Sequence, residues 1–340
     1  MQLLIIDYLS PRGHINFDQI HINALIELGY KVHLVGRKGQ YPAFVGKPNV
    51  EITEIPEFYY KSYPLPTLTD IIKGVLCLKW IKKRVKLEKY WSVIFLSYDT
   101  LTIPFFRTTQ SVYLINHNNV DQIENTIKLK LLERLPFNYI HIALNNFMYD
   151  RLKELFPDKQ IYSIPHGYLA PSANCRKPAF LINKGRVLFC PVNRNIDKEV
   201  MDKILNSKTF NKYLQDNNIL LFVKEQLCSD SLGNVKRLGN LENEEYNYML
   251  NNSMAVLLPY GDGFKYRCSG ILFECVARNT PVIATNRKAL LIYKDEINIH
   301  YFHNEDSLIE AIETIQSVKD KNFDTNHLQP VKYWGGVLNL

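Results

Sequence analysis

The first half of the chain alternates continuous apolar runs with stretches of helical spacing. The apolar runs predict strands at 2–7, 32–35, 50–55, 92–97, 111–115 and 139–144. Between the first two runs, residues 18–28 place Ile22, Leu25 and Ile26 on one helical face, and Gly29 follows as a stop signal. Because uninterrupted apolar strands are typical of sheets buried on both faces, the pattern predicts a parallel sheet covered by helices.

The alternation restarts after residues 161–167 and a linker-like stretch that contains Pro171, Ser172, Asn174 and Pro178. Strands are predicted at 186–192, 219–224, 235–238, 255–258 and 281–285, and helices at 198–205, 242–250, 270–278 and 305–318. Two alternating halves of similar size predict an α/β protein with two Rossmann-like, doubly wound domains that face a cleft. The expected division is 1–168 and 169–325, with 326–340 as a tail that packs back on the first domain.

Composition narrows the class of protein. The chain has 340 residues, 46% of them apolar, and a formal net charge of +7, which fits an anionic ligand or an anionic membrane surface without requiring nucleic acid. Six cysteines without a Cys-x-x-Cys pair predict reduced core residues rather than disulfides or a zinc site. We expect no signal peptide, because the chain enters a strand pattern at once, and no apolar run approaches the ~20 residues of a membrane-spanning helix. These features predict a cytoplasmic protein.

The segment that carries most chemistry lies at 261–274, after the predicted strand 255–258. It combines glycines, two cations and a hydroxyl ahead of a helix, a pattern suited to phosphate because backbone N–H groups at a helix start are unpaired. A carboxylate further along that helix can face the same site and accept hydrogen bonds from sugar hydroxyls. The segment therefore predicts a nucleotide-sugar site formed by the following residues: Lys265, Tyr266, Arg267, Ser269, Gly270 and Glu274.

At this point the chain resembles the GT-B glycosyltransferases, and within them the retaining, nucleotide-sugar-dependent group 1 or family 4-like enzymes. The resemblance rests on a turn at 165–167, a strand followed by Arg194 and Lys198, and a Gly239-containing strand end with Leu241 before an acidic helix. The 261–274 loop and a Pro-Val-Ile strand complete it. The resemblance implies that the first domain binds the acceptor and the second binds the nucleotide sugar.

One position departs from that family. The family has two glutamates eight positions apart, but the residue eight positions before Glu274 is Tyr266. The resemblance therefore implies ribose recognition by Glu274 and leaves the residue that replaces the first glutamate open. Asp262 is the nearest acidic residue but comes four positions too early. Arg267 and Ser269 are expected to compensate through contacts with the diphosphate.

Transfer of a sugar from a nucleoside diphosphate develops negative charge on the leaving group, and cations can stabilise it. Arg194, Lys198 and Arg267 fit this role. Lys265 is the next candidate, and Lys224 stands at a strand end where doubly wound sheets place ligands. The alternative for each is a solvated surface cation.

Three residues of the first half complete the expected site. Gly13 and His14 follow the first strand, in a loop that the resemblance places at the diphosphate and acceptor. His117 follows the fifth strand, and the resemblance places it at the transferred sugar without making it a general base. The alternative for His117 is a loop histidine whose nitrogens bond the backbone. No Asp-x-Asp or His-Glu-x-x-His motif is present, and the resemblance implies that no metal or other cofactor is needed.

Residues 71–91 interleave lysines with large apolar side chains, a pattern typical of a cationic amphipathic helix at a membrane interface. The residues proposed to dock on an anionic membrane or to hold a lipid-linked acceptor are Lys79, Trp80, Lys82, Lys83 and Arg84. The alternative is an ordinary helix with a solvated basic face.

Together these features predict a hexosyltransferase-type glycosyltransferase that moves a sugar from a nucleoside diphosphate to a glycan or lipid-linked acceptor. Retention and a role in cell-surface polysaccharide synthesis are expected, on the inner face of the membrane. Two alternatives stay open: a nucleotide-sugar epimerase of the same fold, and a non-catalytic relative that binds nucleotide sugars. A dinucleotide-dependent oxidoreductase is disfavoured, because no Gly-x-Gly-x-x-Gly follows the first strand.

Overall fold

The computed structural model describes residues 1–9, 14–60, 68–123, 126–181, 186–192, 197–224, 233–317 and 323–338. Contacts divide the chain into two compact units. The first unit comprises Met1–Gly167, Tyr266–Cys268 and Leu328–Leu340, and the second comprises Tyr168–Lys265 and Ser269–His327. The C-terminal segment, expected from the sequence as a tail, thus belongs to the first unit.

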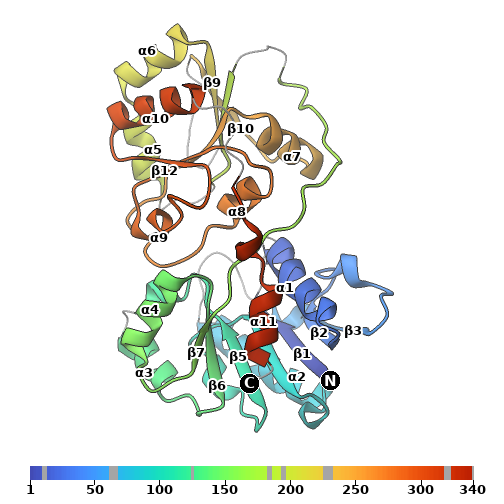
Figure 1. Cartoon of the computed structure of the whole chain (residues 1–340). Coiled ribbons are helices and arrows are strands. Elements are labelled where there is room, and N and C mark those ends of the chain that lie inside the picture. Colours follow the sequence, from blue (N-terminus) through green and yellow to red (C-terminus); the bar gives the residue numbers. More distant parts are fainter. Residues whose placement is uncertain are drawn as a thin grey trace. The chain divides into compact units, whose positions relative to one another are not determined.

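The first unit is built on a parallel sheet, as its apolar runs predict. Over the described residues it has seven strands in the order β3-β2-β1-β4-β5-β6-β7, all paired in parallel (Figure 1). Side chains 3–6 of β1 are fully buried, which explains their unbroken apolar run. The strands are β1 (Gln2–Asp7), β2 (Lys31–Arg37), β3 (Val50–Ile55), β4 (Ser92–Ser97), β5 (Ser111–Ile115), β6 (Tyr139–Ala143) and β7 (Ile161–Ser163).

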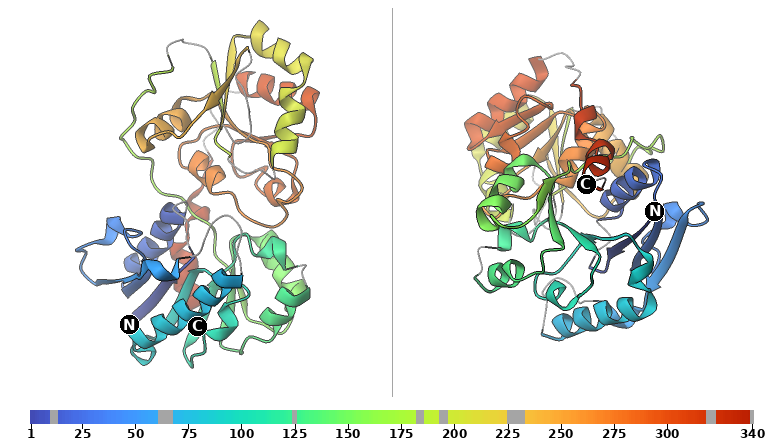
Figure 2. Two further views of the ribbon diagram at one scale, coloured as in Figure 1. Left: turned by 180° about the vertical axis from the view of Figure 1, so that it is seen from behind. Right: turned by 60° about the horizontal axis from the view of Figure 1, so that its bottom comes forward.

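Helices cover both faces of this sheet. Helices α1 and α11 lie on one face and α2 lies on the other, as the front and back views show (Figures 1 and 2). Trp334 of α11 is fully buried, and its Nε1–H donates to Nδ1 of His21 on α1 at 2.9 Å. The helices are α1 (Ile15–Glu27), α2 (Leu68–Arg84), α3 (Thr126–Glu133), α4 (Asn146–Leu155) and α11 (Val331–Leu338).

The second unit repeats this architecture on a smaller scale. Its described strands form a six-stranded parallel sheet in the order β10-β9-β8-β11-β12-β13. The strands are β8 (Arg186–Cys190), β9 (Ile219–Lys224), β10 (Val235–Leu238), β11 (Ala255–Leu258), β12 (Val282–Thr285) and β13 (Ile299–Phe302). The helices are α5 (Lys198–Leu205), α6 (Lys208–Asp216), α7 (Asn243–Asn252), α8 (Gly270–Val276), α9 (Lys288–Leu291) and α10 (Glu305–Ser317). The predicted α/β class with two Rossmann-like units is confirmed.

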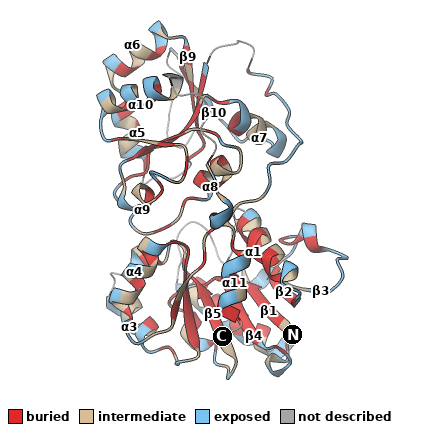
Figure 3. Cartoon of the chain, in the orientation of Figure 1, coloured by how far each residue is buried: buried red, intermediate tan, exposed pale blue. Residues whose placement is uncertain are grey.

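Burial follows the layers of each unit. In both sheets the central strands such as β4 and β11 are buried, whereas the edge strand β3 is partly exposed and the helices expose one side to solvent (Figure 3). Strand order reverses between β1 and β4 in the first sheet and between β8 and β11 in the second. In doubly wound sheets such reversals leave a crevice at the carboxyl ends of the strands, where ligands bind. In each unit, the carboxyl ends of the strands at the reversal point are therefore the expected place for a ligand site.

The turn at 165–167 depends on a glycine. Gly167 has φ of 74°, in the left-handed region. A Cβ there would lie 2.6 Å from Cγ2 of Ile20 and 2.9 Å from Cδ of Pro330, both in the first unit. Neither the backbone angle nor the space allows a side chain, so the sequence needs glycine at this position.

Two expectations from the sequence are wrong. The predicted helix 71–91 is shorter: α2 begins at Leu68 and ends at Arg84, because the buried side chains of Val85 and Tyr90 draw the chain back to the sheet. Trp91 therefore lies outside the helix and stacks on Tyr30. The cysteines are not all core residues, since Cys175 is exposed; Cys228 lies outside the described residues.

A buried histidine gives a test of this core. Both ring nitrogens of His141 are buried without a hydrogen-bond partner in the described part of the chain, and the ring stacks on Phe156 at 5.1 Å. Burial, helped by the charge of Lys159, lowers the pKa of His141 from 6.5 to about 4. Folding therefore opposes protonation of His141. The neutral ring costs the folded state nothing above pH 6.5, and the free energy of unfolding falls as the pH drops from 6.5 toward 4.

We predict that His141→Phe keeps the stacking and removes this acid sensitivity. Between pH 6.5 and 4.5 the wild type should lose about 1.4 kcal/mol of unfolding free energy per pH unit more than the variant. Urea unfolding across this pH range measures the difference. Parallel pH profiles for the two proteins would contradict the assignment of a buried neutral histidine.

Candidate functional site

A buried polar network lies at the carboxyl end of β1, beside β4, where the order of the first sheet reverses. Asp7 accepts hydrogen bonds from Oγ of Ser97 and, at 3.1 Å, from Nε2 of Gln40. The same Gln40 nitrogen donates to Oδ2 of Asp18 at 2.7 Å. Burial, with the charge of Asp7 next in importance, raises the pKa of Asp18 well above its usual value. The carboxyl groups of Asp7 and Asp18 thus share one hydrogen-bond donor at this end of the sheet, and burial disfavours the charged form of Asp18.

Four histidines surround Phe17 near the same edge. The ring centroid of Phe17 lies 6.4 Å from that of His14, and 4.3, 4.3 and 4.8 Å from those of three further histidines, His21, His117 and His166. Burial lowers the pKa of His21 to about 3 and that of His166 to about 4, and holds the pKa of His117 well below its usual range. These three imidazoles are therefore neutral at pH 7 and can offer hydrogen bonds without adding charge.

The predicted sugar contact His117 has a defined orientation within this cluster. Its Nε2 lies 2.9 Å from the carbonyl oxygen of Leu96, so a neutral ring carries its proton on Nε2 and leaves Nδ1 as an acceptor. Its ring lies 5.0 Å from that of His14, whose Nδ1 is buried without a partner among the described residues. The structure therefore brings two predicted residues, His14 and His117, together.

Arg267 lies in the short segment Tyr266–Cys268, which belongs to the first unit although both of its flanks belong to the second. Its guanidinium forms an ion pair with Asp121 in which the side chains are 8% and 5% exposed. Oδ1 of Asp121 accepts from the Tyr266 backbone N–H at 2.7 Å, and NH1 of Arg267 donates to Asn118 at 3.3 Å. The loop after β5, which carries His117, thus also fixes Arg267.

Tyr266, at the position of the missing glutamate, points its ring at α4 of the first unit. The ring stacks on Phe147 with centroids 5.3 Å apart, and the guanidinium of Arg151 lies 5.2 Å from its centroid. Its backbone rather than its phenol therefore shares the contact with Asp121.

In the second unit, Glu274 lies among apolar neighbours on α8 and has a hydrogen-bond partner. The hydroxyl of Tyr246 on α7 donates to Oε2 of Glu274 at 2.7 Å. Burial, followed by the charge of Glu274, raises the pKa of Tyr246 well above its usual value, so the phenol stays protonated. Ser269 caps α8, because its Oγ accepts from the Leu272 N–H at 3.1 Å.

The remaining predicted residues of the second unit follow its strands. Nζ of Lys224, at the end of β9, donates to the carbonyl of Gly239, just past β10, at 3.0 Å, which joins two predicted residues. Lys198, Lys265, Gly239 and Gly270 are exposed, and Leu241 is half-buried. Gly13 and Arg194 lie outside the described residues.

Helix α2 carries the residues predicted to meet a membrane or acceptor. Lys79, Lys83 and Arg84 are exposed, whereas Trp80 and Lys82 are half-buried. Nζ of Lys82 donates to the carbonyl of Arg107 at 2.5 Å, so this lysine is held against the protein. Leu68, Ile72 and Leu76, spaced four residues apart, are 74%, 52% and 40% exposed. Helical periodicity places Lys79 and Lys83 in the same stripe, which we call the α2 stripe.

Sequence reasoning missed several residues of these sites. Asp121 lies in a loop pattern and Asp18 in a helical pattern, and neither pattern indicates a hydrogen-bond partner. Tyr246 could not be distinguished from the other tyrosines of the chain. Asp7 gave the clearest signal, since an acidic residue closes a buried strand at a sheet edge where ligands bind. Over the described residues, we find no group of side chains arranged to hold a metal ion and no helix long and apolar enough to cross a bilayer.

Comparison with known proteins assigns the fold. No protein-family model and no curated protein matches the sequence. Among solved structures, the chain is similar to a sucrose-phosphate synthase from Thermosynechococcus elongatus, with a TM-score of 0.63, 14% identity and coverage of 99% of this chain and 96% of that chain. It is also similar to a UDP-GlcNAc 2-epimerase from Methanocaldococcus jannaschii, with a TM-score of 0.64, 15% identity and full coverage of both chains. Anabaena HepE, solved with UDP-glucose, gives a TM-score of 0.62, 10% identity and coverage of 97% and 92%. These likenesses show that the chain has the GT-B fold.

The two Arg–Asp pairs of the 261–268 segment form a matched test of burial. Asp121 is buried against Arg267, whereas Asp262, which pairs with Arg287, is 95% exposed. We predict that Asp121→Asn, which leaves a buried arginine without its countercharge, lowers the unfolding free energy by about 3–5 kcal/mol. Asp262→Asn should change it by less than about 1 kcal/mol. Chemical denaturation measures both, and equal effects would refute the burial of the first pair.

Proposed function

We propose that this protein is a glycosyltransferase that moves a sugar from a nucleoside-diphosphate donor to a glycan or lipid-linked acceptor. The observation that carries the proposal is the Glu274 carboxylate, held by Tyr246 one turn into α8, which follows β11 at the reversal of the second sheet. A fixed carboxylate at this edge can accept hydrogen bonds from the two hydroxyls of a ribose. Similarity in fold to HepE, which was solved with UDP-glucose, supports a nucleotide-sugar donor.

The cations supply the electrostatic part of the reaction. Cleavage of the sugar–diphosphate bond leaves negative charge on the diphosphate, and we assign its stabilisation to Arg267, Arg194 and Lys198, with Lys224 and Lys265 as further candidates. Asp121 holds the Arg267 guanidinium in one orientation, so the group needs little reordering to meet an anion. The proposal includes no metal ion and no other cofactor.

The neutral histidines serve the sugar rather than the phosphate. We assign His117 to the transferred sugar, because its Nδ1 can accept from a hydroxyl while Nε2 stays on the Leu96 carbonyl. With its pKa held low by burial, His117 offers this hydrogen bond without repelling the positive charge that develops on the sugar ring, and the His14 ring lies 5.0 Å from it. We further propose a retaining, hexosyl transfer in which the leaving phosphate takes the acceptor proton.

One observation favours the epimerase as the second candidate. Such an enzyme needs several acid and base groups near the sugar, and the first unit gathers four histidines with Asp7 and Asp18. A solved structure of similar fold is a UDP-GlcNAc 2-epimerase. Incubation of a nucleotide sugar without acceptor separates the two, since an epimerase interconverts the sugar whereas a transferase does not. A non-catalytic relative would bind the donor and do neither.

We propose that the α2 stripe places the protein on the cytoplasmic face of a membrane during polysaccharide synthesis. Exposed Leu68, Ile72 and Leu76 can enter the headgroup region while Lys79 and Lys83 meet anionic lipids. The net charge of +7 adds long-range attraction. Lipid-linked acceptors would then be within reach.

The donor assignment predicts the effect of removing the Glu274 carboxylate. Glu274→Gln keeps an acceptor for Tyr246 but loses charge-assisted bonds to ribose, so donor affinity and kcat/KM should fall about ten- to a hundredfold. Titration calorimetry with UDP-glucose or other nucleoside-diphosphate sugars, together with a transfer assay, measures this. Glu313→Gln on the exposed side of α10 is the control. Unchanged donor affinity in the Glu274 variant would remove it from the site.

The membrane assignment predicts a site-specific charge effect. Lys79→Glu with Lys83→Glu should abolish most sedimentation with phosphatidylglycerol vesicles, because about 1 kcal/mol of attraction per basic residue turns into repulsion. Lys208→Glu with Lys212→Glu on α6 has the same spacing, exposure and charge change in the second unit. Equal loss in both double variants would show general electrostatic attraction and contradict docking through α2.

A further inference from the structure

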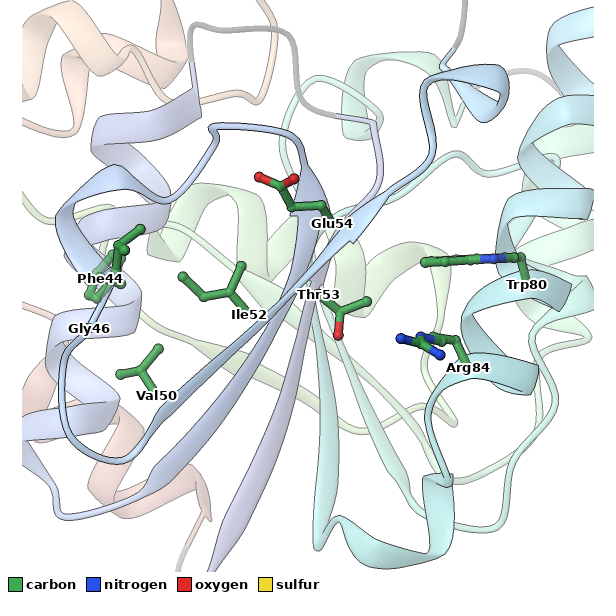
Figure 4. A pocket seen from close by; sticks show the side chains of 9 residues that line it. Phe44, Gly46, Val50, Ile52, Thr53, Glu54, Trp80 and Arg84 are labelled. Carbon is green, nitrogen blue, oxygen red and sulfur yellow. The ribbon is translucent and has the colours of Figure 1, made fainter.

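A groove of about 740 Å³ runs over the outer edge of the first sheet. It is lined in part by Trp80 and Arg84, which the sequence assigned to a membrane or acceptor but which lie outside the α2 stripe. Strand β3 is the last strand of that sheet and pairs only with β2 among the described strands. Figure 4 shows Trp80 and Arg84 reaching from α2 toward β3, with Phe44, Val50 and Ile52 on the other side of the strand. The volume lies within the ~300–1,000 Å³ that ligand sites usually occupy.

The groove mixes apolar surface with a few polar groups of both signs. Phe44, Val45, Val50 and Ile52 give it an apolar wall, and Trp80 adds a half-buried aromatic ring. Glu54 and Arg84 are both exposed. Arg84 makes no hydrogen bond or ion pair with the described part of the chain, so its donors face solvent. Glu54 accepts from the Gly39 N–H at 3.1 Å through Oε1.

This lining argues against two ligand classes. A lipid tail would strip water from Glu54 and Arg84 without replacing their hydrogen bonds, at a cost in free energy. An anion such as a phosphate would meet the Glu54 carboxylate.

A sugar chain has surfaces that match both the apolar and the polar residues of the groove. Each sugar ring has an apolar face of C–H groups, which suits Trp80 and the wall around Ile52, and a rim of hydroxyls that both donate and accept. The Arg84 guanidinium is a planar fork that can donate to two neighbouring hydroxyl oxygens, and Glu54 can accept from others. We propose that the groove between Trp80 and Arg84 of α2 and the edge of β3 binds a segment of a glycan chain.

The position suggests which part of a glycan is bound. Strand β3 lies two places from β1 in the sheet, or about 10 Å at the usual strand spacing, whereas the polar residues of the first unit gather at β1, β4 and β5. The groove would therefore hold sugars behind the reacting end of an acceptor and favour long acceptors over short ones. This inference rests on the proposed function only in taking the acceptor to be a glycan.

The direct test is binding to an array of immobilised oligosaccharides of two to eight hexose or N-acetylhexosamine units, with no donor present. The wild type should bind a subset of the longer chains. Trp80→Leu keeps an apolar contact for Tyr59, and Arg84→Gln changes only an exposed side chain. Each variant should bind those chains at least about tenfold more weakly. Lys86→Gln, an exposed basic residue two positions beyond α2, should bind as the wild type does.

Transfer assays give a second readout that a loss of stability would not mimic. If the groove holds the rear of the acceptor, Trp80→Leu and Arg84→Gln raise KM for a long acceptor, with kcat and the KM of a one-sugar acceptor unchanged. Weaker array binding in both variants supports glycan binding in the groove, whether or not transfer is observed. A lack of transfer would count only against the proposed function. Absence of binding to every glycan, or equal binding by all variants, overturns the inference; capture of extended peptides in place of glycans does so too.

Discussion

Burial of parallel strands on both faces is the constraint on which the rest of this structure depends. In each unit the central strands are lined mainly with fully buried apolar side chains, and buried polar residues within them, such as His141 in β6, are the exception. Most polar candidate groups therefore lie at the strand ends. The described candidate groups at the sheet edges obey this rule. Asp7 closes β1, His117 follows β5, Lys224 closes β9, and the segment with Ser269 and Glu274 follows β11. The candidate functional groups therefore lie where these strands stop.

Within that constraint, partners decide what each polar group can do. Tyr246 holds the carboxylate of Glu274, and Asp121 holds the guanidinium of Arg267, so both predicted donor residues are oriented by residues that never need to touch a ligand. The histidines show the complementary effect, because burial lowers the pKa of three of them and disfavours their charged form. The first unit thus contains neutral imidazoles and one fixed guanidinium, and the second unit separately contains a fixed carboxylate.

The fold could be predicted from the sequence because most strands are continuous apolar runs separated by clear helical or loop patterns. Strands β3, β9, β10 and β11 lie where their apolar runs predict them. The predicted helix 71–91 extends too far because the spacing of basic residues continues past Arg84. In the structure, α2 ends at Arg84 and the side chains of Val85 and Tyr90 are buried in the core. The partners of the candidate site escaped prediction for the same reason. Asp121 and Arg267 are 146 residues apart, and no local pattern records which loops meet.

The central claim is that the second unit grips a nucleoside-diphosphate sugar through Glu274. The most direct test is an experimental structure of the full chain with such a donor bound. The account predicts the ribose hydroxyls within hydrogen-bond distance of Glu274, with Tyr246 still on Oε2, and the diphosphate in contact with Arg267 or its neighbouring cations. A donor bound elsewhere, with Glu274 making no contact to the nucleotide, would contradict it.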